Sequence, residues 1–114
     1  MENRFMVIGW VSGELQLENV GENVVVKFQI NSMKKYPKKD NKYDHFFCSA
    51  WNNVASRIVD QLSKGDEVLL IGRIETSNFI SKRTNQNEYR QIVIVESFKK
   101  IKSSEYLLPE EELL

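Results

Sequence analysis

Residues that commonly carry catalytic or metal chemistry are scarce in this 114-residue sequence, which contains one cysteine, Cys48, and one histidine, His45. One cysteine excludes an intrachain disulfide and fits a reducing, cytoplasmic compartment. A zinc site needs more cysteine or histidine ligands than these, so we expect no metal. Neither a glycine-rich phosphate loop nor a zinc-protease motif is present. The sequence therefore favours a protein that is not an enzyme and needs no cofactor.

Long apolar segments are also missing. The longest apolar runs, such as Val68–Ile71, are far too short to cross a membrane, and Met1–Arg4 opens no secretory signal. We therefore expect a chain without a membrane partner. Its length predicts a single domain that folds around a modest core.

A net charge of either sign is absent as well, because 16 basic residues balance 16 acidic ones. The distribution is nevertheless uneven. Residues 103–114 hold four glutamates and no base, so residues 1–102 carry 16 basic and 12 acidic residues, an excess of four positive charges. A cluster of lysines opposed only by Asp40 lies in positions 34–42: Lys34, Lys35, Lys38, Lys39 and Lys42. Such a run is often only a solvated loop, but it is also a candidate contact for a polyanion.

Alternation of apolar and polar residues with a period of two indicates β-strands. We expect strands over 5–11, 24–32, 44–51, 67–79 and 89–101, loops over 33–42 and 81–87, and a helix over 54–62 capped by Asn52 or Asn53. Five strands with a helix after the third predict an OB-fold, a Greek-key barrel, over residues 1–102. Residues 103–114 are expected to form a short, acidic and flexible tail.

Exposed aromatic residues near basic ones are the second notable feature. Binders of single-stranded nucleic acid combine a basic groove with rings on which bases stack, whatever the sequence. The alternation places Trp51 on the polar face of its strand with His45 and Phe47, and Phe79 on the outward face of its strand with Arg73. Trp51 could instead pack under the helix that follows it, and Phe79 could instead pack in the core. Four cations could bind phosphate or only keep the surface soluble: Arg73, Lys82, Arg83 and Arg90.

The order and spacing of three segments resemble the bacterial-type single-stranded DNA-binding proteins, including their phage and plasmid versions, over about residues 3–102. The segments are the opening N-R-F-M-V-I-G, the central F-F-C-S-A-W-N-N-V-A-S-R-I-V-D-Q-L-S-K-G-D-E-V-L-L-I-G-R-I-E-T and the closing strand over 89–101. The resemblance implies binding of single-stranded DNA without sequence preference in replication, recombination and repair. It also implies a homotetramer, with a dimer as the alternative.

The resemblance further implies roles for particular residues. Trp51 and Phe79 match aromatic residues that stack on DNA, and Tyr36 falls near a third. His45 replaces a fourth aromatic, for which Tyr43 or Phe47 could substitute. Outward Leu69 and Ile71 fit a subunit interface. The remaining residues of the predicted DNA-binding surface are Lys27, Lys34, Lys35, Lys38, Lys39, Arg73, Lys82 and Arg83.

Two alternatives remain at this point: a primosomal-type dimeric OB protein that assists replication restart, and an OB domain that binds other proteins. The tail L-L-P-E-E-E-L-L lacks the linker and terminal phenylalanine with which cellular members of the family recruit replication and repair proteins. Recruitment of such proteins through the tail is therefore only a possibility, and the shortness of the chain favours a phage- or plasmid-type member.

Overall fold

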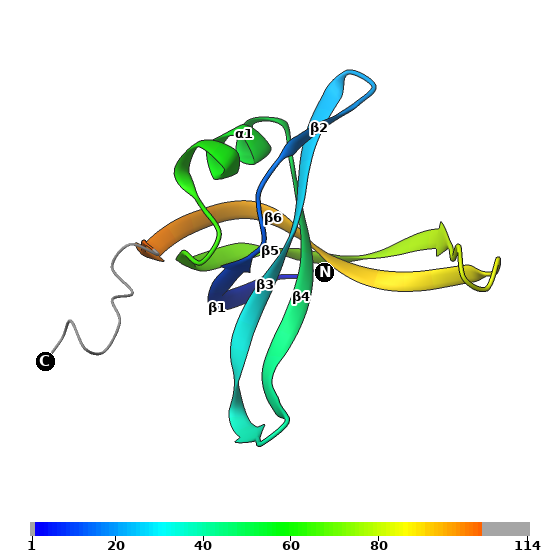
Figure 1. Cartoon of the computed structure of the whole chain (residues 1–114). Coiled ribbons are helices and arrows are strands. Elements are labelled where there is room, and N and C mark those ends of the chain that lie inside the picture. The colour runs from blue at the N-terminus through cyan, green and yellow to red at the C-terminus, as the bar shows by residue number, and fades with distance from the viewer. Residues whose placement is uncertain (1, 104–114) are drawn as a thin grey trace, which may run out of the picture.

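The computed structural model describes residues 2–103 as six strands and one helix (Figure 1). The strands are β1 (Phe5–Ser12), β2 (Leu17–Val20), β3 (Asn23–Lys38), β4 (Asn41–Trp51), β5 (Glu67–Ile80) and β6 (Asn87–Lys102). Helix α1 (Asn52–Gln61) lies between β4 and β5. The sheet order is β1-β5-β6-β4-β3-β2, and an additional pairing of β1 with β3 closes the barrel. The predicted OB-fold is confirmed.

Closure of the barrel depends on two short pairings. Strand β1 pairs with β5 from Phe5 to Trp10 and then with β3 from Trp10 to Ser12, so Trp10 lies where the strand changes partner. Strands β4 and β6 run parallel and pair only through Cys48 with Val93 and Ser49 with Ile94. Parallel pairing of strands so far apart in the chain is what the Greek-key connection produces.

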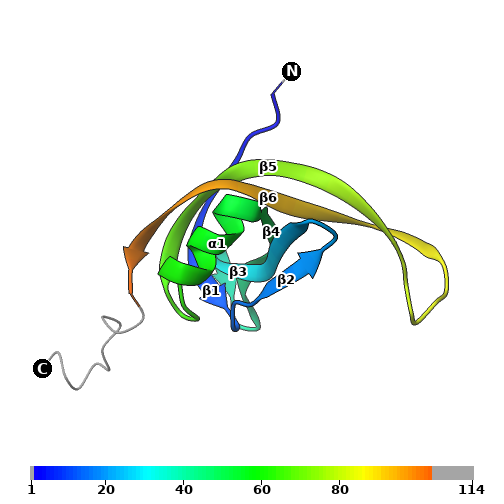
Figure 2. The ribbon, with the colours of Figure 1, turned by 90° about the horizontal axis from the view of Figure 1, so that it is seen from above.

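The core consists of inward side chains from five strands and one face of the helix. Alternating residues of three strands are buried: Val26, Phe28, Ile30, Cys48, Ala50, Val68 and Leu70. Helix α1 adds Ala55 and Ile58, followed by Leu62 just after the helix. The helix packs against β3 and β4 and lies beneath the arch that β5 and β6 form in Figure 2. The period-two alternation therefore assigned most of the inner-face residues correctly; Val25 and Ser49, which it placed on the outer faces, are also buried.

Close approach of β5 and β6 requires a glycine at one position. A Cβ atom on Gly72 would lie 2.0 Å from the carbonyl oxygen of Ile94, closer than any side chain can be placed. The register between these strands shifts at Ile71 and Gly72, next to this contact. Such a shift increases local twist and lets the long hairpin curve over the barrel.

The segment over 33–42 is not the loop that its composition predicted. Strand β3 continues to Lys38 and β4 begins at Asn41, so only Lys39 and Asp40 form the turn of a long hairpin. An irregular register between Met33 and Lys38 accommodates Pro37, which has no amide hydrogen to donate. A cross-strand ion pair between Lys34 and Asp44 stabilises this polar hairpin. The loop between β5 and β6 does occur, and its bounds are close to those expected.

Two smaller differences concern β2 and the start of α1. Strand β2, which was not predicted, pairs with β3 through a turn at Gly21, where φ is +61°. The helix begins at Asn52, and no side chain caps it. The Asn52 side-chain oxygen instead accepts a hydrogen bond from the amide of Val24 at 3.1 Å. Asn52 therefore fastens the helix start to β3, and the capping prediction was wrong.

Candidate nucleic-acid interface

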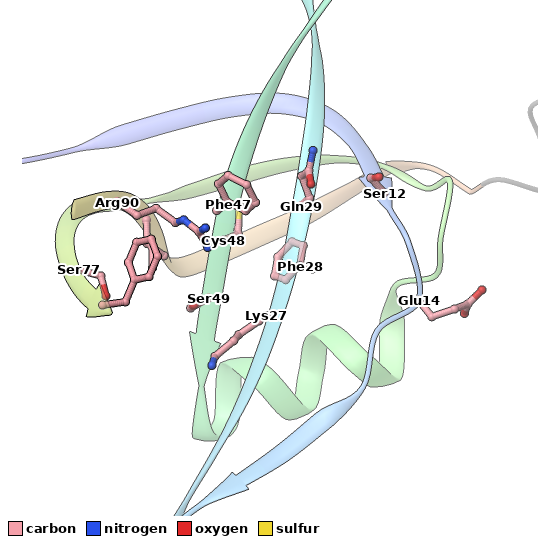
Figure 3. Close-up of a pocket in the computed structure, with 12 residues that line it drawn as sticks. Ser12, Glu14, Lys27, Phe28, Gln29, Phe47, Cys48, Ser49, Ser77 and Arg90 are labelled. Atoms are coloured by element: carbon pink, nitrogen blue, oxygen red, sulfur yellow. The ribbon is translucent and has the colours of Figure 1, made fainter. Parts of the chain in front are cut away.

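A groove of about 560 Å³ separates the outer face of β3 and β4 from the β5–β6 hairpin (Figure 3). Two smaller hollows, of about 400 and 260 Å³, share lining residues with it. Lys27, Ser49 and Ser77 line both the groove and the larger hollow, and Phe47 lines both the groove and the smaller one. The three spaces therefore adjoin one another, and we call them together the trough.

Successive outward residues of β4 follow the length of the trough. Trp51 lines the larger hollow, Ser49 and Phe47 line the central groove, and His45 lines the smaller hollow. Six residue steps at about 3.3 Å each extend over about 20 Å. The Trp51 and Phe47 side chains are 39% and 44% exposed, so their rings are accessible from solvent. Neither ring belongs to the buried core.

Phe79 and Arg90 form the opposite wall of the central groove. Arg90 reaches from β6 toward Phe47 on β4 in Figure 3. Its guanidinium carbon lies 4.5 Å from the centre of the Phe47 ring and 4.8 Å from the centre of the Phe79 ring. Arg90 thus contacts aromatic residues of two different strands at once.

The placement of Arg90 follows from the register of the β5–β6 hairpin. Arg90 lies opposite Ser77, and Phe79 lies opposite Glu88. Residues two apart on a strand share a face, so Arg90 and Phe79 project from the same face of the hairpin. The sequence contained a signal for this shared face, because it predicted two strands joined by a short polar loop. The alternation within one strand alone did not separate Arg90 from the other surface cations.

His45 and Tyr43 have different surroundings in the structure. Nδ1 of His45 lies 2.6 Å from the side-chain oxygen of Asn31. Tyr43 packs edge-on against Trp10, with ring centres 6.3 Å apart, and neither residue lines the trough. Of the two aromatic residues considered as substitutes near His45, only Phe47 therefore lies in the trough.

The predicted basic residues do not form one surface. Lys27 lies in the trough, opposite Ser49 in the register. Tyr36, which is 79% exposed, lies on the β3–β4 hairpin with Lys34, Lys35, Lys38 and Lys39. Lys35 lies 5.6 Å from the centre of the Tyr36 ring. Lys82 and Arg83 lie exposed in the turn of the other long hairpin, which projects in a different direction (Figure 1).

Arg73, another residue predicted to bind DNA, is paired with an acidic side chain. Its Nη1 atom is 2.9 Å from Oε1 of Glu75, and this hydrogen bond together with the carboxylate charge raises the pKa of Arg73. Arg73 lines none of the three spaces of the trough. By contrast, the ion pairs found within residues 2–103 include neither Lys27 nor Arg90, so their charges face the trough without a paired carboxylate.

Leu69 and Ile71 lie on the outer face of the barrel and are half-buried. Across the pairing with β1 they oppose Ile8 and Met6, whose side chains are 51% and 66% exposed. These four side chains form an apolar area on β1 and β5 that we call the outer patch.

The described residues offer little for catalysis. Residues 2–103 contain no group of three histidine, cysteine, aspartate or glutamate side chains that could hold a metal ion. Burial raises the pKa of Cys48 to about 12, so its thiol stays protonated at neutral pH and is a poor nucleophile. No helix in this part of the chain is long and apolar enough to cross a membrane.

The model of the single-strand binding protein family matches residues 2–101, which cover almost the whole barrel. A search of the curated proteins finds no match.

Proposed function

The chain belongs to the single-strand binding protein family, and from this premise we propose that its trough holds single-stranded DNA without sequence preference. The family is a non-enzymatic family that binds single-stranded DNA. The observation that carries the proposal is the gathering of three rings, those of Trp51, Phe47 and Phe79, around adjoining hollows on one face of the barrel.

Base stacking supplies the affinity inside the trough. Each base stacked on an aromatic side chain contributes about 1–3 kcal/mol, and every base offers a flat face. The groove is lined by neutral polar side chains such as Gln29, Ser49 and Ser77 and by the charged side chains of Glu14, Lys27 and Arg90. Because stacking uses the flat face that every base has, binding that depends on these rings tolerates any sequence.

Positive charge supplies the second contribution. Lys27 and Arg90 lie inside the trough, and the lysines of the β3–β4 hairpin extend the positive surface beyond the His45 end of β4. Phosphate contacts release counterions, so this part of the affinity falls as salt rises. Lys82 and Arg83 at the other hairpin turn are further candidates for phosphate contact.

The cellular role that fits these properties is protection of single-stranded DNA in replication, recombination and repair. We propose a homotetramer in which the outer patch of Met6, Ile8, Leu69 and Ile71 is buried between subunits. The runner-up is a dimeric, primosomal-type protein, which particle mass would distinguish. The tail beyond Ser103 lies outside the described residues, and recruitment of replication or repair proteins through it stays a prediction.

The test is a titration of fluorescein-labelled oligo-dT, followed by anisotropy at two salt concentrations, with particle mass measured in parallel. Phe79→Ala should weaken binding about tenfold or more, because it removes a ring worth about 1–3 kcal/mol. Tyr89→Ala is the matched control, because this exposed aromatic lies next to Arg90 on the opposite face of the same hairpin. The wild-type plot of log K against log salt should fall by about 0.7 for each phosphate contacted.

Two results would contradict the proposal. Wild-type affinity in folded Phe79→Ala would remove the trough as the DNA site. No binding of oligo-dT even at low salt would favour an OB domain that binds other proteins.

A further inference from the structure

Arg90 lies between the rings of Phe47 and Phe79 in the central groove. Its guanidinium carbon lies within 5 Å of both ring centres. The guanidinium is flat and delocalised and stacks on aromatic faces. A nucleobase is also flat and stacks on the same kind of face. In the DNA-free protein, Arg90 therefore fills the position that the two rings offer to a base.

The guanidinium is held there only weakly. Among the ion pairs of residues 2–103, none involves Arg90, and no hydrogen bond described for its side chain fastens it to either strand. Its partners are two rings on the wall of an open groove. An unpaired cation in such a place is attracted to any phosphate that enters the groove with its base.

We propose that Arg90 is a displaceable place-holder. In the free protein its guanidinium lies between the Phe47 and Phe79 rings and keeps the gap between them open. An incoming base displaces the guanidinium from this gap, and the guanidinium then contacts the adjacent phosphate. The proposal rests on the proposed function and adds a specific step to it. The same side chain opposes the base and attracts the phosphate, so its removal should have opposite effects on ligands with and without backbone charge.

The experiment compares two ligands of equal length, oligo-dT and a thymidine oligomer with uncharged methylphosphonate linkages. Arg90→Ala should bind the uncharged oligomer about threefold or more tightly than wild type, because nothing competes for the gap. It should bind oligo-dT about threefold or more weakly, and the salt dependence of log K should decrease by about 0.7, the value for one phosphate.

Two further variants separate the place-holder from simpler roles. Arg90→Lys keeps the charge but loses the flat group, so it should bind both oligomers more tightly than wild type with an unchanged salt dependence. Arg57→Ala is the matched control, because Arg57 also stacks on a phenylalanine, Phe98 at 5.2 Å, but lies on α1 and lines no part of the trough. Its affinity for both ligands should equal that of wild type.

Three outcomes would overturn the proposal. Weaker binding of both oligomers by folded Arg90→Ala would make Arg90 a support for the rings. Unchanged binding of the uncharged oligomer would leave only a phosphate contact. If the uncharged oligomer binds to none of the proteins, the affinity of Arg90→Lys for oligo-dT becomes the deciding measurement. An affinity of this variant equal to or below that of wild type would refute the place-holder. The Phe79→Ala variant tests the DNA site separately. If this variant loses binding while the Arg90 variants give any of these results, the place-holder is refuted but the trough remains the DNA site.

Discussion

Trp51 should contribute more to DNA affinity than any other single side chain at its end of the trough. It is the last residue of β4 and lines the 400 Å³ hollow together with Lys27, Ser49 and Ile94. Its side chain is accessible, and stacking of one base on such a ring is worth about 1–3 kcal/mol. Since about 1.4 kcal/mol corresponds to a tenfold change, Trp51→Ala should weaken binding of oligo-dT by roughly 5- to 150-fold.

The two tryptophans make the choice of assay important. Trp10 packs on Tyr43 outside the trough, so only Trp51 should be quenched directly by a stacked base. Affinity is therefore measured by anisotropy of labelled oligo-dT, and quenching of the protein's own emission serves as a second measurement. Trp51→Phe is the informative partner variant, because it keeps a ring for stacking. It should retain affinity within a few-fold of wild type while losing most of the quenching.

The covered part of the Trp51 ring has a structural role that must be kept apart from binding. Trp51 lies opposite Val25, which is completely buried, so truncation to alanine should also lower the free energy of unfolding. Thermal unfolding monitored by circular dichroism establishes the temperature at which each variant is folded. If folded Trp51→Ala binds oligo-dT as tightly as wild type, or if quenching persists in Trp51→Phe, the assignment of this ring to the DNA is wrong.

Two further predictions concern the barrel. Replacing both Leu69 and Ile71 by aspartate should dissociate the oligomer, because the substitutions place charges in the outer patch. Light scattering measures the particle mass, and an unchanged mass would place the interface elsewhere. Gly72→Ala should lower the free energy of unfolding by about 1–3 kcal/mol or more, since its Cβ would meet the Ile94 carbonyl oxygen at 2.0 Å. Gly21→Asn is the control in chemical denaturation, because no atom lies within 4 Å of a Cβ placed at Gly21 and asparagine tolerates positive φ. An equal loss of unfolding free energy in both variants would refute the role of the Gly72–Ile94 contact.

The faces of the strands could be predicted because burial on one side of a barrel imposes a period of two on the sequence. In β4 the alternation separated Phe46, Cys48 and Ala50 from Phe47 and Trp51, and the structure has the same division. The order of the predicted strands and helix then indicated the OB-fold, and the resemblance gave roles to particular aromatic residues. Together they supplied the fold and placed His45, Phe47 and Trp51 along one face.

Features that depend on pairing between strands could not be predicted from the local pattern. The lysine-rich segment forms strand because main-chain pairing continues beyond the core, where no apolar side chain is needed to mark it. Strand β2 was missed for a similar reason, since all four of its residues are exposed. The meeting of Arg90 with Phe47 joins β6 to β4, and no spacing within one strand specifies a contact across the groove.

The rings and the positive charges contribute to DNA binding at different places on the protein. The rings line the trough, whereas most lysines project on the β3–β4 hairpin, so stacking and phosphate attraction act on different parts of the same strand of DNA. Salt screens the second contribution but changes the first little. The zero net charge of the chain is therefore compatible with binding a polyanion. Affinity depends on which charges line the path of the DNA. Lys27 and Arg90 lie on that path and take part in none of the ion pairs found within residues 2–103, whereas Arg73, which pairs with Glu75, lies outside the trough.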